Sequence, residues 1–127
     1  MKLSTPLEHQ IQKAFFQWWE LQYGNPLCWA TPNGGYRNIV TATKLKAEGV
    51  RAGVPDVFLA IPNGEYHGLF MEFKRAKGKL QPNQELYLAL LSQVGYKAVV
   101  VRSIKEAIDI VEAYLKGLKP RRVSVTT

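Results

Sequence analysis

The sequence has only one cysteine, Cys28, and two histidines, so several kinds of site are excluded from the start. A single cysteine cannot form a disulfide bond within the chain, which fits a reducing compartment. The cysteine and the histidines do not have the spacing of a zinc site. We therefore expect His9 and His67 to be structural or exposed, and Cys28 to be buried and unreactive.

Long apolar runs are also missing. No segment is long enough to span a bilayer, and the N-terminus lacks the pattern of a signal peptide. No internal repeat or low-complexity linker is present, and 127 residues fit a single domain. We therefore expect a cytoplasmic protein with no membrane partner.

Acidic residues are scarce relative to basic ones. Seventeen Lys and Arg stand against ten Asp and Glu, which gives a net charge of +7. Hydrophobic residues make up 46% of the chain, so it can build a core despite this charge. A basic surface favours a polyanionic partner, and nucleic acid is the commonest one. The alternative at this point is a basic soluble protein with no such partner.

The first helix is predicted to begin near Thr5. Thr5 would be the N-cap, Pro6 would take the first helical position, and Glu8 follows the cap by three residues as in a capping box. The segment 24–26 ends this helix. Apolar residues at helical spacing form one face: Leu7, Ile11, Phe15 and Trp18.

The predicted strands cover residues 27–31, 57–61, 69–74 and 97–102, and further helices cover 41–48, 82–94 and a segment from 104 onward. The second and third strands form a candidate hairpin. This order, αβββαβ with a short inserted helix and a C-terminal helix, predicts an α/β fold with a mixed four-stranded sheet flanked by helices.

The last two helices carry distinct apolar patterns. In the helix over 82–94 the predicted buried residues are Leu86, Leu90 and Val94. Ser103 and Glu106 form a capping box for the last helix. Its apolar stripe consists of Ile104, Ala107, Ile108, Val111 and Leu115. Residues 1–116 are expected to form the domain, and the basic tail over 117–127 is expected to be frayed.

Three charged residues lie where strands are predicted. Side chains alternate along a strand, so Glu72 and Lys74 point to the same side, away from Met71 and Phe73. Charges in such an apolar segment are costly unless they are partnered or used. Asp56 follows Pro55 at the start of another strand. If the two strands are neighbours, Asp56 and Glu72 converge at one end of the sheet.

Two nearby carboxylates repel each other, and a hard divalent cation relieves that repulsion. Mg²⁺ typically uses one or two carboxylates together with waters and phosphate oxygens. A lysine on the same face can orient a water and stabilise developing charge. Metal, carboxylates and lysine together make a phosphodiesterase site. The structural alternative is that Lys74 is a surface residue paired with Glu72 and that Asp56 is a turn residue after Pro55.

Together these motifs resemble the PD-(D/E)xK nuclease superfamily, and within it the VRR-NUC family of virus-type replication-repair nucleases. The resemblance covers about residues 5–115 and includes the segments 53–56 and 71–74 together with Gln84. Further typical segments are 32–35, 44–50, 68–70, 95–96 and 99–102. It implies a restriction-endonuclease-like core and a standalone, single-domain member in a bacterial or viral-host cytoplasm.

The resemblance also implies residue roles. Asp56, Glu72 and the backbone carbonyl of Phe73 would bind Mg²⁺ or Mn²⁺, and Lys74 would be the catalytic lysine. Gln84 would lie near the scissile phosphate. Glu8 would match an acidic residue that assists metal or water binding, although its position in the predicted capping box gives it a structural alternative. Gln84 likewise has an alternative as an ordinary polar residue in the first turn of a helix.

Several basic residues outside this constellation are candidate nucleic-acid contacts: Arg75, Lys77, Lys79, Arg37, Lys44 and Arg51. The first three lie in the loop after Lys74, so binding would depend strongly on salt. The alternative for this loop is a solvated surface. Arg102, at the end of the last predicted strand, is left open between DNA contact and packing.

The leading hypothesis is therefore a metal-dependent, structure-specific DNA endonuclease. Branched DNA such as a Holliday junction is the expected substrate, because the resemblance extends to junction resolvases that work as homodimers. Two-fold symmetry would place two active sites on opposite strands. The alternatives are a non-catalytic nucleic-acid-binding module with the same basic surface, and an enzyme that uses the carboxylates on another substrate.

Overall fold

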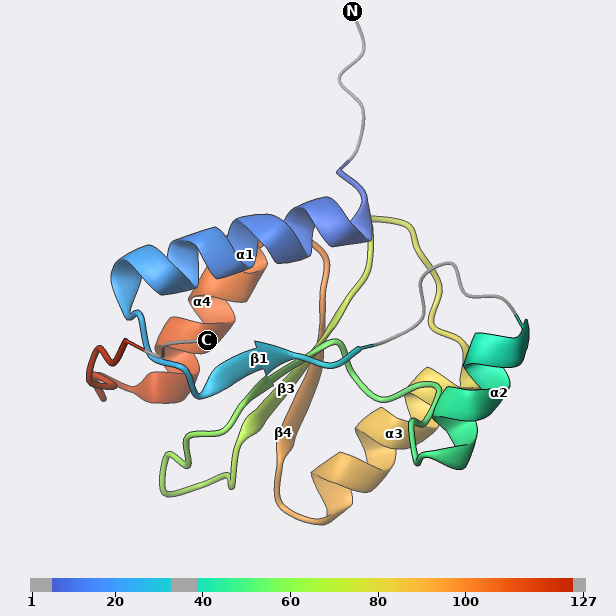
Figure 1. The fold of residues 1–127 in the computed structure, drawn as a ribbon. Coiled ribbons are helices and arrows are strands. Elements are labelled where there is room, and N and C mark those ends of the chain that lie inside the picture. The colour runs from blue at the N-terminus through green and yellow to red at the C-terminus, as the bar shows by residue number, and fades with distance from the viewer. Residues whose placement is uncertain (1–5, 33–38, 125–127) are drawn as a thin grey trace, which may run out of the picture.

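A computed structural model describes residues 6–32 and 39–124, in which helices and strands follow the predicted order (Figure 1). The helices are α1 Glu8–Gln22, α2 Ile39–Ala47, α3 Pro82–Gln93 and α4 Ile104–Leu115. The strands are β1 Cys28–Ala30, β2 Val57–Leu59, β3 Leu69–Phe73 and β4 Lys97–Val101. None of the described helices is both long and apolar enough to cross a bilayer. Thr5 lies outside the described residues.

The strands form one four-stranded sheet in the order β1-β2-β3-β4. β1 pairs with β2 and β2 with β3 in antiparallel orientation, whereas β3 and β4 are parallel. The predicted mixed sheet is therefore confirmed, as is the antiparallel pairing of the second and third strands. A parallel pair needs a crossover connection, and α3 supplies it between β3 and β4.

The hydrophobic core lies between one face of this sheet and the pair α1 and α4 (Figure 1). Alternate residues of β3 point into it, and Leu69, Met71 and Phe73 are almost completely buried. The ring centroid of Phe15 on α1 lies 5.9 Å from that of Phe73. The intervening residues of β3 therefore point to the opposite face, on whose side α2 and α3 lie in Figure 1.

The start of α1 differs from the prediction. Leu7 takes the N-cap position, so Pro6 precedes the helix and Glu8 is its first residue. The side chain that reaches back is that of Gln10, whose Oε1 accepts a hydrogen bond of 2.8 Å from the backbone N–H of Leu7. A glutamine at the third helical position can fill this role as well as a glutamate. The carboxylate of Glu8 is therefore not used for capping.

The buried face of α1 is also shifted from the predicted one. Ile11 and Phe15 are buried as expected, but the third core residue is Trp19, and Trp18 is only partly buried. Leu7 is exposed. The indole N–H of Trp19 donates a hydrogen bond of 2.7 Å to the carbonyl of Asn25, which satisfies its polar group inside the core.

The predicted buried face of α3 is wrong. Leu86, Leu90 and Val94 are 55%, 46% and 62% exposed, and no residue of α3 is fully buried. The helix packs along β4 with its other side, on which Tyr87 and Leu91 are half-buried. The spacing of the leucines correctly indicated a helix, but another apolar side faces the sheet.

The start of α4 agrees with the prediction except in one hydrogen bond. The hydroxyl of Ser103 accepts a hydrogen bond of 3.1 Å from the N–H of Glu106. The carboxylate of Glu106, however, accepts from the N–H of Arg102 at 3.3 Å rather than from that of Ser103. Of the predicted stripe, Ala107, Val111 and Leu115 are buried, and Tyr114 joins them in the core.

The two histidines and the cysteine lie as expected. His9 and His67 are exposed, and Cys28 is buried at the start of β1. Burial raises the pKa of the Cys28 thiol, and the nearby charge of Glu20 raises it further. The thiol is therefore held in its neutral form, which is a poor nucleophile.

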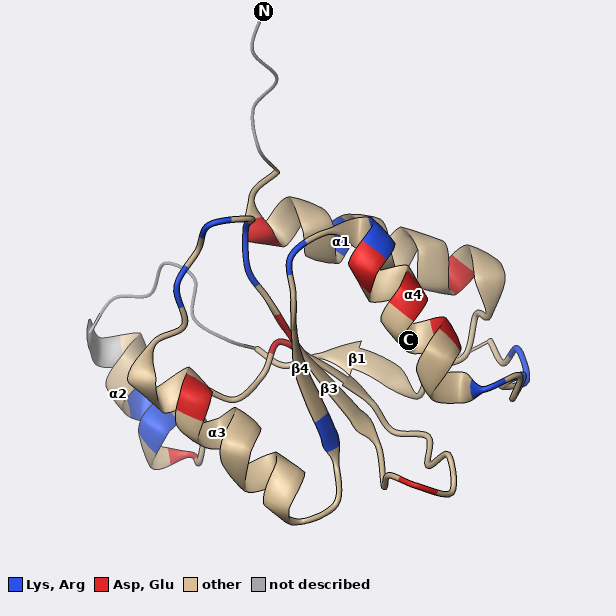
Figure 2. Cartoon of the chain, turned by 180° about the vertical axis from the view of Figure 1, so that it is seen from behind, with Lys and Arg blue, Asp and Glu red and all other residues tan. Residues whose placement is uncertain are grey.

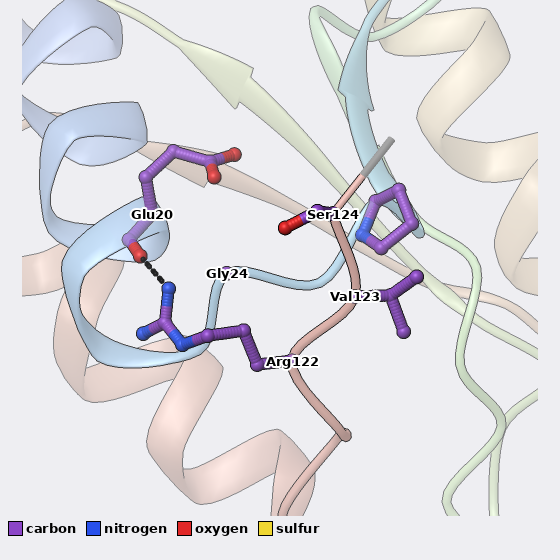
Figure 3. A pocket seen from close by; sticks show the side chains of 6 residues that line it. Glu20, Gly24, Arg122, Val123 and Ser124 are labelled. Carbon is purple, nitrogen blue, oxygen red and sulfur yellow. Dashed lines mark hydrogen bonds between the residues drawn. The ribbon is translucent and has the colours of Figure 1, made fainter. Parts of the chain in front are cut away.

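The basic tail is not frayed where the structure describes it. Arg122 donates hydrogen bonds of 3.0 Å and 2.9 Å to the carbonyls of Glu20 and Leu21 in the last turn of α1. The carbonyl of Gly24 accepts from the N–H of Val123 at 3.1 Å. The tail and the end of α1 thus enclose a small surface pocket, shown in Figure 3. A guanidinium here satisfies carbonyls that a helix end leaves unpaired.

We expect Arg122→Ala to lower the free energy of unfolding by about 1 kcal/mol, since it removes two charge-assisted hydrogen bonds at an exposed helix end. Urea denaturation followed by circular dichroism measures this loss. Lys119→Ala removes the same charge from an exposed position of the tail and should change stability by less than about 0.5 kcal/mol. Equal losses in both variants would contradict the helix-capping role of Arg122.

Candidate functional site

The pairing of β2 with β3 places two carboxyl groups side by side. Val57 is opposite Met71 in the antiparallel register, so the preceding residue of β2, Asp56, lies opposite Glu72. Both side chains point to the face away from α1 and α4, because Val57 and Met71 point into the core. The structure thus brings together the two acidic residues that the sequence predicted to converge.

Asp56 is held in place by the backbone of β3. Its Oδ2 accepts a hydrogen bond of 2.7 Å from the N–H of Phe73. Its own backbone carbonyl accepts from the N–H of Thr31 at 2.7 Å, which continues the pairing with β1. The segment before Asp56 reaches this position through Gly53, which has a φ of +95° and lies against the backbone of Asn83 in α3.

Glu72 is the most deeply buried charged residue of the described chain, with 2% of its surface exposed. Its Oε1 is the one buried side-chain polar atom without a hydrogen-bond partner in the described residues. The pKa of Glu72 is raised to about 9, mainly by burial and further by a hydrogen bond with Asp56 and the charges of Asp56 and Glu8, whereas the charge of Lys74 lowers it. An unpartnered oxygen in such a place is costly and indicates a group that a ligand completes.

Lys74 follows β3 directly and lies on the same face as Glu72. Its N–H donates a hydrogen bond of 2.9 Å to the carbonyl of Val101, so the backbone pairing with β4 extends through this position. Only 7% of Lys74 is exposed, which is unusual for a lysine. The surface alternative for Lys74 is therefore wrong, although its charge does act on Glu72 as that alternative supposed.

Glu8 joins this group from a distant part of the sequence. As the first residue of α1 it carries negative charge at a helix N-terminus, which is favourable. Its charge contributes to the raised pKa of Glu72. A β-carbon on Gly78 would lie 3.5 Å from Oε1 of Glu8, so the loop after β3 passes close to this carboxylate. We call the three carboxylates Glu8, Asp56 and Glu72, together with the lysine beside them, Lys74, the acidic cluster.

The acidic cluster has the donors that a hard divalent cation uses. No three His, Cys, Asp or Glu side chains of the described residues are arranged to hold a metal ion by themselves. Mg²⁺ does not require such a cage, because it keeps waters and takes one or two carboxylates. Asp56, the unpartnered Oε1 of Glu72 and the neighbouring backbone of Phe73 fit this pattern.

Gln84 lies in the first turn of α3, where its Oε1 accepts a hydrogen bond of 2.8 Å from the N–H of Gln81. The side-chain oxygen therefore caps α3, much as that of Gln10 caps α1. Gln84 is thus a polar residue in the first turn of a helix, as its structural alternative supposed. Its amide nitrogen is the side-chain donor that could contact a substrate. Gln81 precedes Pro82, which takes the first helical position as predicted.

The candidate nucleic-acid contacts are exposed wherever the structure describes them. Arg75, Lys77 and Lys79 lie in the loop between β3 and α3, Lys44 lies on α2, and Arg51 follows that helix. Figure 2 shows the blue segments of this loop next to the acidic first turn of α1 and the acidic strand ends. Arg37 lies outside the described residues.

Ion pairs within the described chain join Lys105 with Asp109 and Lys116 with Glu65. Among the described residues, neither pair involves the cations of the loop after β3.

Two contributions to the site were missed in the sequence. The backbone N–H of Phe73 fixes Asp56, and only the register of β2 with β3 reveals this contact. The capping role of Gln10, which leaves the carboxylate of Glu8 unused, has a faint sequence signal. A glutamine three residues after Leu7 fits a capping box, but leucine is a poor N-cap residue.

Comparison with known proteins points to one family. A family model described as the VRR-NUC domain matches residues 7–105, which include the whole acidic cluster. A solved structure described as a VRR_NUC domain protein is similar with a TM-score of 0.77 and 31% sequence identity. That similarity covers 98% of this chain and 100% of the other. No match was found among curated proteins.

The raised pKa of Glu72 predicts how stability depends on pH in metal-free protein. The folded pKa of about 9 exceeds the ordinary value of 4.5, so between these values the folded state keeps a proton that the unfolded chain loses. Raising the pH through this window therefore favours unfolding, by at most about 1.4 kcal/mol per pH unit. Urea denaturation in EDTA from pH 5 to 9 measures this fall.

Glu72→Gln should remove this part of the pH dependence and be more stable than the natural protein at pH 8, because it folds without having to take up a proton. Glu85→Gln changes an exposed carboxylate of α3 and should leave the profile as it is. Two results would show that Glu72 is ionised in the fold. One is a natural protein whose free energy of unfolding does not fall above pH 5, and the other is a Glu72→Gln variant whose free energy of unfolding falls as steeply as that of the natural protein.

Proposed function

The chain belongs to the VRR-NUC family of nuclease-type domains, and we propose that it is a metal-dependent endonuclease that cuts branched DNA such as a Holliday junction. The observation that carries the proposal is the unpartnered Oε1 of Glu72, buried beside Asp56 and Lys74. A fold tolerates an incompletely satisfied carboxylate pair at a site where a ligand completes it.

Asp56, Glu72 and the carbonyl of Phe73 would hold Mg²⁺ or Mn²⁺, with Glu8 as a further acidic group beside them. When bound, such an ion would lower the pKa of a coordinated water and neutralise charge on the phosphoryl group. The hydrogen bond from the N–H of Phe73 fixes Oδ2 of Asp56 and so sets the direction of the other oxygen, Oδ1. This arrangement supports the metal proposal by fixing a ligand before the ion arrives.

Lys74 would act on the reacting phosphate itself. Lys74 as a whole is nearly buried, so its charge is poorly screened by solvent. In that position it can orient the attacking water and stabilise the negative charge that develops on the phosphoryl oxygens. The amide nitrogen of Gln84 would contribute a further hydrogen bond near the scissile phosphate, since its oxygen is used in capping.

The cations of the loop after β3 would bind the DNA backbone next to this site. Arg75, Lys77 and Lys79 are exposed within a few residues of Lys74, and Lys44 and Arg51 would extend the contact. Contacts of this kind position a duplex without reading its sequence. They agree with a nuclease that selects DNA by its shape.

The alternative is a nucleic-acid-binding module without catalysis, which would use the same loop. The acidic cluster opposes it, because buried carboxylates weaken DNA binding and destabilise the fold when no cation neutralises them. An enzyme acting on an uncharged substrate is opposed by the exposed cations beside the cluster. Salt-dependent DNA binding without cleavage in any divalent metal would favour the module.

We expect the natural protein to cut a four-way junction with Mg²⁺ or Mn²⁺, and Lys74→Ala to cut it at least about a hundredfold more slowly. Single-stranded, duplex, flap and junction DNAs, tested side by side, determine the preferred structure. Lys105→Ala, which removes an exposed lysine from α4, is the matched control and should retain activity. Cleavage in EDTA, or equal rates for Lys74→Ala and the control, would overturn the proposal.

We further propose that the chain works as a homodimer through the exposed apolar stripe of α3, formed by Leu86, Leu90 and Val94. These residues lie on one side of the helix. Two copies that each carry a charge of +7 repel each other least where no like charges meet at the contact, and α3 contains no Lys or Arg and a single Glu. This absence of like charge supports α3 as the contact between copies.

Leu86→Glu combined with Leu90→Glu should convert a dimer into a monomer, because it places four carboxylates in the contact. Light scattering coupled to size exclusion measures the mass. Leu21→Glu is the matched control, since Leu21 is an apolar residue of α1 that is 83% exposed. A monomeric natural protein at micromolar concentration, or a double variant that stays dimeric, would contradict an interface on α3.

A further inference from the structure

Arg102 lies at the junction between β4 and α4, and its guanidinium is directed at the loop after β3. Its Nη1 is 3.0 Å from the carbonyl oxygen of Arg75, 3.3 Å from that of Ala76 and 2.7 Å from that of Gly78. These three residues are 24 to 27 positions away in sequence. One nitrogen thus donates hydrogen bonds to most of the carbonyl oxygens of a single turn.

The turn itself is tight. The N–H of Gly78 donates a hydrogen bond of 2.9 Å to the carbonyl of Arg75, which closes a four-residue turn. A β-carbon at position 78 would lie 3.5 Å from Oε1 of Glu8, which is ordinary van der Waals contact, so the turn lies close to the acidic cluster. Carbonyls at 75, 76 and 78 face Arg102, while the side chains of Arg75 and Lys77 are exposed.

The position of Arg102 is itself well defined. Its N–H donates to the carboxylate of Glu106 at 3.3 Å, and the next residue, Ser103, caps α4. Its backbone therefore belongs to a connection of two residues between Val101 at the end of β4 and Ile104 at the start of α4. A guanidinium mounted on such a short connection can hold a loop that has no helix or strand of its own.

We infer that Arg102 is a positioning residue that holds the loop 75–79 in its DNA-binding shape, and that it does not contact DNA. The inference rests on the proposed function. Backbone carbonyls repel phosphate, and Arg102 turns three of them inward. The loop cations are thereby presented outward in one arrangement before DNA arrives, so binding loses less conformational entropy.

The first test measures the loop without DNA. Trypsin cleaves after Arg75, Lys77 and Lys79 only when the loop opens. The rate of cleavage at these three sites in native protein therefore measures how firmly the loop is held. Arg102→Ala should raise this rate about tenfold, whereas Arg102→Lys, which keeps a donor cation, should stay closer to the natural protein. An unchanged rate in Arg102→Ala would overturn the inference, whatever the protein does with DNA.

The second test separates positioning from contact. The affinity for a four-way junction is measured against salt concentration for the natural protein, for Arg102→Ala, for a loop-neutral variant that combines Arg75→Ala, Lys77→Ala and Lys79→Ala, and for the loop-neutral variant with Arg102→Ala added. Arg102→Ala should weaken binding about tenfold and lower the salt slope by about one to two, because loop contacts with phosphates are lost. In the loop-neutral background the same substitution should have little further effect.

Equal losses in both backgrounds would overturn the inference, since Arg102 would then contact DNA by itself. The urea midpoint of Arg102→Ala is measured in parallel, and Arg102→Lys should restore the salt slope if its fold is intact. A natural protein that binds no junction DNA would refute the proposed function, while the trypsin rates would still decide whether Arg102 anchors the loop.

Discussion

The antiparallel register of β2 with β3 is the constraint on which the site depends, because it forces two carboxyl groups to be neighbours in a nearly dry environment. Asp56 is stabilised there by the N–H of Phe73, but Glu72 keeps an oxygen without a partner. Burial raises the pKa of Glu72, and the hydrogen bond and charge of Asp56 raise it further. A shift of β2 by one residue in this register would turn Asp56 toward the core and away from Glu72, so pairing and site are determined together.

The two faces of the sheet serve different purposes. On one face the alternate residues of β3 pack against α1 and α4 and form the core. On the other face the intervening residues carry the acidic cluster and a row of aromatic rings, with the centroids of Phe58 and Phe70 4.2 Å apart. Phe73 connects the faces, since its ring packs on Phe15 while its backbone N–H holds Asp56. We therefore expect a substitution of Phe15 in the core to alter the geometry of the site as well.

Much of the fold was predictable because its signals are local. The order of elements, the starts of α3 and α4 and the inward stripe of α4 follow from periodicity, proline and capping residues. The start of α1 was missed because Thr5 and Glu8 fit a capping box better than Leu7 and Gln10 do. The exposed side of α3 was missed because leucine spacing shows that a helix has an apolar side but not what covers it.

The same distinction, between what local sequence signals predict and what only the fold shows, applies to the site. Alternation along a strand predicted that Glu72 and Lys74 share a face, and the register of β2 and β3 confirmed that Asp56 lies beside Glu72. The anchoring of the basic loop by Arg102 is invisible in sequence, because its partners are backbone carbonyls and carry no side-chain signature. The family resemblance identified the acidic residues but did not contain these backbone contacts.

The unpartnered oxygen of Glu72 has a consequence for how such a chain changes over generations. A substitution that removes one carboxylate relieves the buried repulsion and makes the metal-free fold more stable, while it ends any chemistry that needs both. A lineage released from that chemistry would therefore drift toward neutral side chains at these positions without harm to folding. The joint presence of Asp56 and Glu72 is what continued selection for a working site would preserve against that drift.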